Sequence, residues 1–133
     1  MSNSIATGVA YADPEFVTCY ASGQIGYTTA AQGAVTQATS KSTDVTLNSS
    51  MGRITMNAAS LAANTAVSFN LNNSLIGAND LIIVNVSGGG TTGAYTSYVS
   101  SLASGVAVLT LRNLTGGALA EAVILNFAII HGQ

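Results

Sequence analysis

Few side chains of this chain have the chemistry of a catalytic site. His131 is the one histidine and Cys19 the one cysteine among 133 residues. A catalytic histidine must be held rigidly beside a nucleophile, and no nucleophile motif surrounds His131. A reactive thiolate needs a positive charge nearby, whereas Cys19 lies in the apolar and aromatic setting FVTCY. We therefore expect a surface or interface role for His131 and a buried, unreactive thiol at Cys19.

Carboxylates are too sparse to predict a metal site or a hydrolase. Asp13 and Glu15 lie two residues apart, but no third ligand is near them. From residue 26 onward the acidic residues are only Asp44, Asp80 and Glu121, and none are closely spaced. Glycoside hydrolysis uses two facing carboxylates. We predict no enzyme activity, no catalytic residues, no metal and no cofactor. A depolymerising enzyme stays a third alternative, since carboxylates of different subunits could meet.

The composition describes a surface of uncharged hydrogen-bonding groups. Charged residues make up 6% of the chain, against about 25% in an average soluble domain. The net charge is −2 and the three basic residues are dispersed, so we expect no nucleic-acid partner. The most apolar run, residues 122–130, is shorter than the roughly 20 residues of a membrane-spanning helix. We expect no membrane partner, and the weak charge repulsion favours a homo-oligomer.

Residues 1–25 differ from the rest of the chain. They contain the one proline, Pro14, and the aromatic residues Tyr11, Phe16 and Tyr20. The residue before a proline avoids the helical region, so this stretch is predicted to be extended. It also lacks the basic and apolar regions of a signal peptide, which predicts synthesis in a cytoplasm. We interpret it as an N-terminal arm with apolar attachment points at Tyr11, Pro14, Phe16 and Tyr20.

From residue 44 onward the hydrophobic pattern has a period of two. This period is typical of strands with one buried face. In residues 80–87, by contrast, both faces are apolar, which predicts a strand covered on both sides. Glycines such as those at 88–90 supply tight turns, here a hairpin tip; a phosphate loop would require a Lys-Ser/Thr pair and a helix. The predicted strands lie within residues 45–47, 53–57, 67–72, 80–87, 95–101, 106–113 and 120–130.

Strands that recur every 10–15 residues predict an all-β fold, an antiparallel β-sandwich that is jelly-roll-like. Two segments allow two interpretations each. Residues 26–43 are either a loose linker or an extended segment laid against a neighbour. Residues 57–64 form either one helical turn or a loop with an apolar plug at Leu61.

The scarce charges form a second group of candidate residues. Arg53 and Arg112 each lie within a strand pattern. We hypothesise that at least one arginine pairs with Glu121 or Asp44, across a subunit boundary in one version. The alternative is a solvated strand face, and an exposed pair would contribute only about 0–1 kcal/mol. The predicted subunit-interface charges are Lys41, Asp44, Arg53, Arg112 and Glu121.

Three segments together resemble phage virion structural proteins of the trimeric capsid decoration (cement) or fibre-module kind. These are SIATGVAYADPEF (residues 4–16), GYTTAAQGAVTQATSKSTDVTLN running into GRITMN (residues 26–57), and the strands that end in LRNLTGGALAEAVILNFAIIHG. TQATSKST is the most specific part, and the resemblance covers nearly the whole chain. It implies a homotrimer, with an attachment arm (residues 1–25) and a β-sandwich trimerisation module (residues 26–133).

The short distance between the opening segment and the module favours a cement protein. Longer proteins of this kind often carry fibre-like sequence there, whereas here only residues 17–25 intervene. The resemblance thus implies a protein made in the bacterial cytoplasm that binds the phage major capsid protein on the outer head surface. The alternative is a tail-fibre or receptor-binding tip that recognises a host surface glycan.

Overall fold

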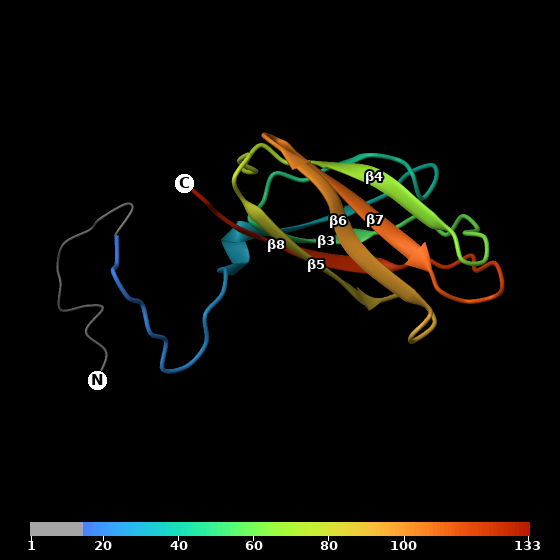
Figure 1. Ribbon diagram of the computed structural model, residues 1–133, viewed down its shortest axis with the longest axis horizontal. Helices are drawn as coiled ribbons and strands as arrows, with labels where there is room; N and C mark the ends of the chain where they lie inside the picture. Colours follow the sequence, from blue (N-terminus) through green and yellow to red (C-terminus); the bar gives the residue numbers. More distant parts are fainter. Residues whose placement is uncertain (1–14) are drawn as a thin grey trace.

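The computed structural model describes residues 15–133, in which two four-stranded sheets pack into a sandwich (Figure 1). One short 3-10 helix, η1 (Thr29–Ala31), precedes the strands. The strands are β1 (Gln32–Thr36), β2 (Val45–Thr46), β3 (Met51–Thr55), β4 (Ala66–Asn72), β5 (Leu81–Gly88), β6 (Tyr95–Ala103), β7 (Val106–Asn113) and β8 (Ile124–Ile130). No helix in residues 15–133 is long and apolar enough to cross a membrane.

The strand order follows a nested pattern. Sheet A has the order β1-β3-β8-β5, and sheet B has the order β2-β4-β7-β6. Early strands pair with late ones, β3 with β8 and β4 with β7, so the chain wraps around the core as in a jelly roll. The prediction of an all-β, jelly-roll-like sandwich is confirmed.

The expectation that all strand pairs are antiparallel is wrong for two of them. β1 and β3 are parallel, and so are β2 and β4. The cause is that β1 to β4 alternate between the sheets. After the chain has passed from one sheet to the other and back again, it runs in its original direction. β1 and β3 of sheet A therefore pair in parallel, and so do β2 and β4 of sheet B.

The core lies between the two sheets and is apolar. In β8 the inward side chains are Leu125, Phe127 and Ile129, and each is at most 1% exposed. Leu109 and Leu111 of β7 face them from sheet B with no exposed surface. Burial of such side chains is the main source of stability, about 1.5–3 kcal/mol for each one.

A pair of glycines lets a leucine enter the core at one edge. Gly33 of β1 and Gly52 of β3 are register partners. A Cβ atom on either would lie within 2.8 Å of a Leu47 methyl group, and at Gly52 also 2.7 Å from the Phe127 ring. The two glycines therefore form a slot in the inner surface of sheet A that Leu47 fills.

Three local expectations are resolved by the structure. Residues 26–43 were expected to be a loose linker or an extended segment laid against a neighbour. The segment Gln32–Thr36 is instead strand β1 of sheet A, paired with β3 of the same chain, so neither interpretation holds there. Residues 57–64 form the predicted loop, with Leu61 5% exposed and bridged to Leu119. The expectation that residues 80–87 are covered on both faces is wrong for this chain, because Leu81 and Ile83 are about half exposed on the outer face of edge strand β5.

The glycine-rich stretch after β5 forms a turn, but it is not the tip of a hairpin. β5 belongs to sheet A and β6 to sheet B, so the connection arches between the sheets. Gly89 and Gly93 have φ values of 74° and 78°, which favour glycine. A Cβ at Gly89 would also lie 2.2 Å from the carbonyl oxygen of Ala122.

Candidate functional site

The N-terminal segment leaves the sandwich and packs against none of its core. Residues 15–30 are all exposed, and the chain runs away from the body in Figure 1. Phe16 is 68% exposed and Tyr20 92% exposed, and both were predicted to be attachment points. The other two, Tyr11 and Pro14, lie outside the described residues. The attachment role of all four stays a prediction.

Cys19 corrects one expectation from the sequence. Its thiol is exposed, whereas the apolar and aromatic neighbours predicted burial. Those neighbours lie on the same extended segment, with no second layer of chain over them. A locally apolar sequence therefore does not bury a side chain here.

The base of the arm is fixed to the sandwich by one tyrosine. The Tyr27 hydroxyl donates a hydrogen bond to the carbonyl oxygen of Ile129 in β8. The Gln32 amide donates to the Tyr27 carbonyl oxygen at 3.2 Å. The arm therefore departs from a defined point, beside the end of β8 and the start of β1.

The two arginines lie on opposite outer faces of the sandwich. Arg53 projects from β3 in sheet A and Arg112 from β7 in sheet B, and both are exposed. Within residues 15–133 the one salt bridge joins His131 and Asp80, so neither arginine pairs with Glu121 or Asp44 in the same chain. Pairing between subunits stays a prediction.

Lys41 lies inside the sandwich of its own chain. It is only 3% exposed, and its ammonium donates hydrogen bonds to the carbonyl oxygens of Asn57 and Glu121. Burial lowers the pKa of Lys41, opposed by the nearby Glu121 charge. Gln37 is also buried and donates to the carbonyl oxygens of Lys41 and Thr43 at 3.0 and 2.9 Å. The TQATSKST segment is thus a polar clasp that fastens β1 to the loops around β3 and β8.

Glu121 and Asp44 both hold loops through their carboxylates. Glu121 accepts hydrogen bonds from the Thr91 amide and hydroxyl and from the Tyr95 hydroxyl, at 2.7–3.0 Å. These hydrogen bonds lower the pKa of Glu121, and the bond from the Thr91 amide contributes most. Burial and the bond to Glu121 raise the pKa of Tyr95 to about 12. Asp44 accepts from the backbone and side-chain amides of Asn70.

Asp80 fastens the end of the chain to the turn before β5. Its carboxylate accepts hydrogen bonds from the Gly77 and Gly132 amides at 2.7 and 3.0 Å, and lies 2.9 Å from His131 Nδ1. The Gly77 amide is the main cause of a lowered pKa at Asp80. His131 itself is 55% exposed, which agrees with the surface role expected for it.

These carboxylates predict that the protein loses stability in acid. The pKa values of Asp80 and Glu121 lie below their ordinary values of 3.8 and 4.5, so the native state favours the charged forms. The contribution of these two carboxylates to the free energy of unfolding is complete above about pH 5 and is lost as the pH falls through their lowered pKa values. Thermal melts between pH 6 and pH 2 should show this decline, and Asp80→Asn should make it shallower. An Asp80→Asn variant with the pH dependence of the parent protein would contradict the prediction.

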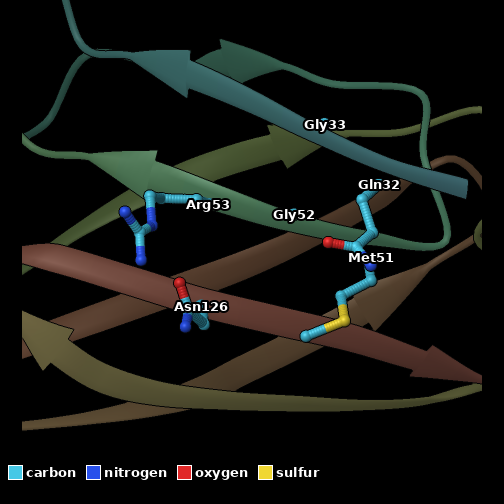
Figure 2. A pocket seen from close by; sticks show the side chains of 6 residues that line it. All are labelled: Gln32, Gly33, Met51, Gly52, Arg53 and Asn126. Atoms are coloured by element: carbon cyan, nitrogen blue, oxygen red, sulfur yellow. The ribbon is translucent and has the colours of Figure 1, made fainter. Parts of the chain in front are cut away.

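A shallow hollow on the outer face of sheet A contains a single charged side chain. It is lined by Gln32, Gly33, Met51, Gly52, Arg53 and Asn126. Figure 2 shows the side chains of Met51, Arg53 and Asn126 projecting from the same side of the sheet. One cation among neutral groups offers no acid–base pair. In the part of the chain that the structure describes, no group of three His, Cys, Asp or Glu residues could hold a metal ion.

The outer face of sheet B carries a row of hydroxyl groups. The Thr110 hydroxyl lies 2.7 Å from the Ser68 hydroxyl and is also hydrogen bonded to the Ser100 hydroxyl. Tyr98 is the register partner of Thr110 and is 46% exposed. This face is polar and nearly uncharged, with one exposed aromatic ring.

Sequence reasoning missed the buried polar residues. Asn113 is fully buried; its amide donates to the carbonyl oxygens of Leu61, Ala62 and Gly117, and its oxygen accepts from the Thr115 amide and hydroxyl. The signal was its place at the end of a strand pattern, directly before the turn LTGG. These partners belong to two separate loops, which no local pattern reveals.

Comparison with known proteins gives no relative for this chain. No protein-family model, curated protein or solved structure matches it. A functional proposal therefore depends on the arm, the two outer faces and the resemblance carried by individual segments.

Proposed function

We propose that this chain is a non-enzymatic phage capsid decoration (cement) protein. It is made in the bacterial cytoplasm, binds the outer surface of the head as a homotrimer through the major capsid protein, and stabilises the shell. The observation that carries this proposal is the arm: an apolar, extended segment, unpacked against its own body, leaves a compact, nearly neutral sandwich at a fixed point.

The physical basis of shell stabilisation is multivalent contact. A trimer presents three arms from one rigid body, so the second and third attachments occur at high effective concentration. Aromatic side chains are the commonest dominant contacts in interfaces. Phe16 and Tyr20 are free for this role because they bury little surface in their own subunit. We assign the attachment to Tyr11, Pro14, Phe16 and Tyr20.

The sequence supports the head rather than a fibre. A fibre has to reach a receptor at a distance, whereas residues 17–25 alone separate the opening segment from the module. The TQATSKST segment supports the assignment to phage virion proteins by its resemblance. It builds the clasp around Lys41 in the structure, so the most specific part of the resemblance has a structural role.

The arm is tested with the double variant Phe16→Asp/Tyr20→Asp. We expect binding to undecorated heads of the encoding phage to weaken about 1,000-fold, because two interface anchors contribute about 2 kcal/mol each. Co-sedimentation of the purified protein with heads measures the effect.

The matched control is Leu114→Asp, at a 49% exposed apolar residue of the loop after β7. Its binding should equal that of the parent protein. Undiminished decoration by the double variant, or by a chain without residues 1–20, would refute the arm assignment. Failure of the parent protein to bind any head would refute the cement function.

The second candidate is a tail-fibre or receptor-binding tip. The hydroxyl row of sheet B beside Tyr98 favours it, since a neutral hydrogen-bonding face with an aromatic ring suits a surface glycan. The number of copies per particle separates the two candidates. Hundreds of copies on purified virions support decoration of the head, and a few dozen or fewer support the tail.

A further inference from the structure

The two outer faces of the sandwich differ in chemistry. Sheet B exposes the hydroxyl row described above. Sheet A exposes large apolar side chains instead: Leu81 is 59% exposed, and Ile83 and Ile130 are each 51% exposed. Contiguous exposed apolar surface on a globular protein commonly marks an interaction site.

Strand register gathers these side chains into one patch. Leu81 of β5 is paired with Ile130 of β8, and Ile83 is paired with Ala128. Ala128 is paired on its other side with Met51 of β3. Residues paired across strands project from the same face, so the apolar patch (Met51, Leu81, Ile83, Ala128 and Ile130) continues over three strands.

The rest of this face is nearly uncharged. The next row along the strands is Arg53, Asn126 and Asn85, which are register partners. None of the four strands of sheet A contains Asp or Glu, and Arg53 is their one charged residue. A face that binds a charged partner would be expected to carry complementary charges. Depletion of charge around an apolar centre is instead typical of the interfaces of homo-oligomers.

The outer face of sheet A supplies part of the surface that a contact between subunits buries. Four strands span roughly 20 Å across the sheet and are on average roughly 20 Å long, a projected area of roughly 400 Å². A stable interface buries about 800 Å² of accessible surface on each partner. The base of the arm extends the surface at this end, because the Tyr27 hydroxyl is bonded to Ile129, next to Ile130.

We infer that a second copy of this chain covers the outer face of sheet A, with the apolar patch at the centre of the contact. This interface rests on the self-association in the proposed function: the outer face of sheet A is the surface through which the copies associate. Sheet B and its hydroxyl row then face outward. The arm emerges at the rim of the contact, free to reach another protein.

The test compares aspartate substitutions at matched positions on the two faces. Ile83→Asp charges the patch on edge strand β5, and Tyr98→Asp charges a 46% exposed side chain on edge strand β6 of sheet B. Light scattering of the full chain over about 1–100 µM measures the mass, and circular dichroism verifies the fold. Ile83→Thr, which keeps a β-branched side chain, replaces Ile83→Asp if the latter does not fold.

We expect the parent protein and Tyr98→Asp to be homo-oligomers, and the Ile83 variant to need at least a 100-fold higher concentration to associate. An Ile83→Asp variant of unchanged mass would overturn the assignment of this face, and so would loss of association by both variants. A monomeric parent protein would overturn the second copy as the occupant. Head binding is measured separately: a parent protein that associates through this face but binds no head refutes the cement function and leaves this interface standing.

Discussion

Replacement of Asn113 by leucine is expected to destabilise the sandwich by about 4 kcal/mol, a large part of the 5–15 kcal/mol that holds a typical domain folded. The Asn113 amide is fully buried and bonded to the loop before β4 and the loop after β7. Leucine has a similar size but makes none of these bonds. The carbonyl oxygens of Leu61 and Gly117 would lose a partner in a place where water does not easily replace it.

Urea unfolding followed by circular dichroism measures this change. Asn79→Leu is the matched control, since Asn79 is exposed, and its free energy of unfolding should change by less than about 0.5 kcal/mol. Asn113→Asp keeps the acceptor oxygens but sets a carboxylate against three carbonyl oxygens, so it should also be strongly destabilising at neutral pH. A loss below about 1 kcal/mol for Asn113→Leu would show that the two loops are held by other contacts.

Replacement of Gly52 by alanine is the second substitution with a large expected effect. The added Cβ would lie 2.6 Å from a Leu47 methyl carbon and 2.7 Å from the Phe127 ring. Phe127 is 1% exposed and belongs to the packed core, and Leu47 is partly buried against that core, so the Phe127 ring cannot move without displacing other side chains. We expect a loss of about 3 kcal/mol and a melting temperature lower by roughly 10 °C.

Gly88→Ala is the control, because Gly88 also lies in a strand of sheet A but has no atom within 4 Å of the position of a Cβ. The double variant Gly52→Ala/Leu47→Ala should recover part of the loss, since the shortened side chain vacates the slot. A melting temperature of Gly52→Ala equal to that of Gly88→Ala would mean that the sheets separate easily at this point.

Strands with regular alternation could be predicted from the sequence nearly to the residue. Residues 106–113 form β7 as expected, and residues 67–72 lie within β4 (Ala66–Asn72). β1 was missed because glycine and alanine occupy two of its five positions, so the apolar period is not visible. The parallel pairing of β1 with β3 depends on which sheet each strand joins, and that choice is made by contacts far apart in the sequence.

The candidate site could be predicted only in part. The arm was expected from composition, and Phe16 and Tyr20 are exposed as an attachment role requires. The roles of the charges were harder to predict, because Lys41 and Glu121 meet partners about 80 and 30 residues away in the chain. The apolar patch of sheet A could not be predicted for a further reason. Residues 80–87 have two apolar faces, which predicts burial of both, whereas the chain itself covers only the inner face of β5.

The position of β8 determines when sheet A can be completed. β8 is the last strand of residues 15–133, yet it lies between β3 and β5 and is bonded to both. Until β8 is in place, sheet A is divided and Leu81 has no neighbour at Ile130. Pairing of strands so distant in sequence is slow. A partly folded chain without β8 therefore lacks the complete apolar patch that is proposed to bind a second copy.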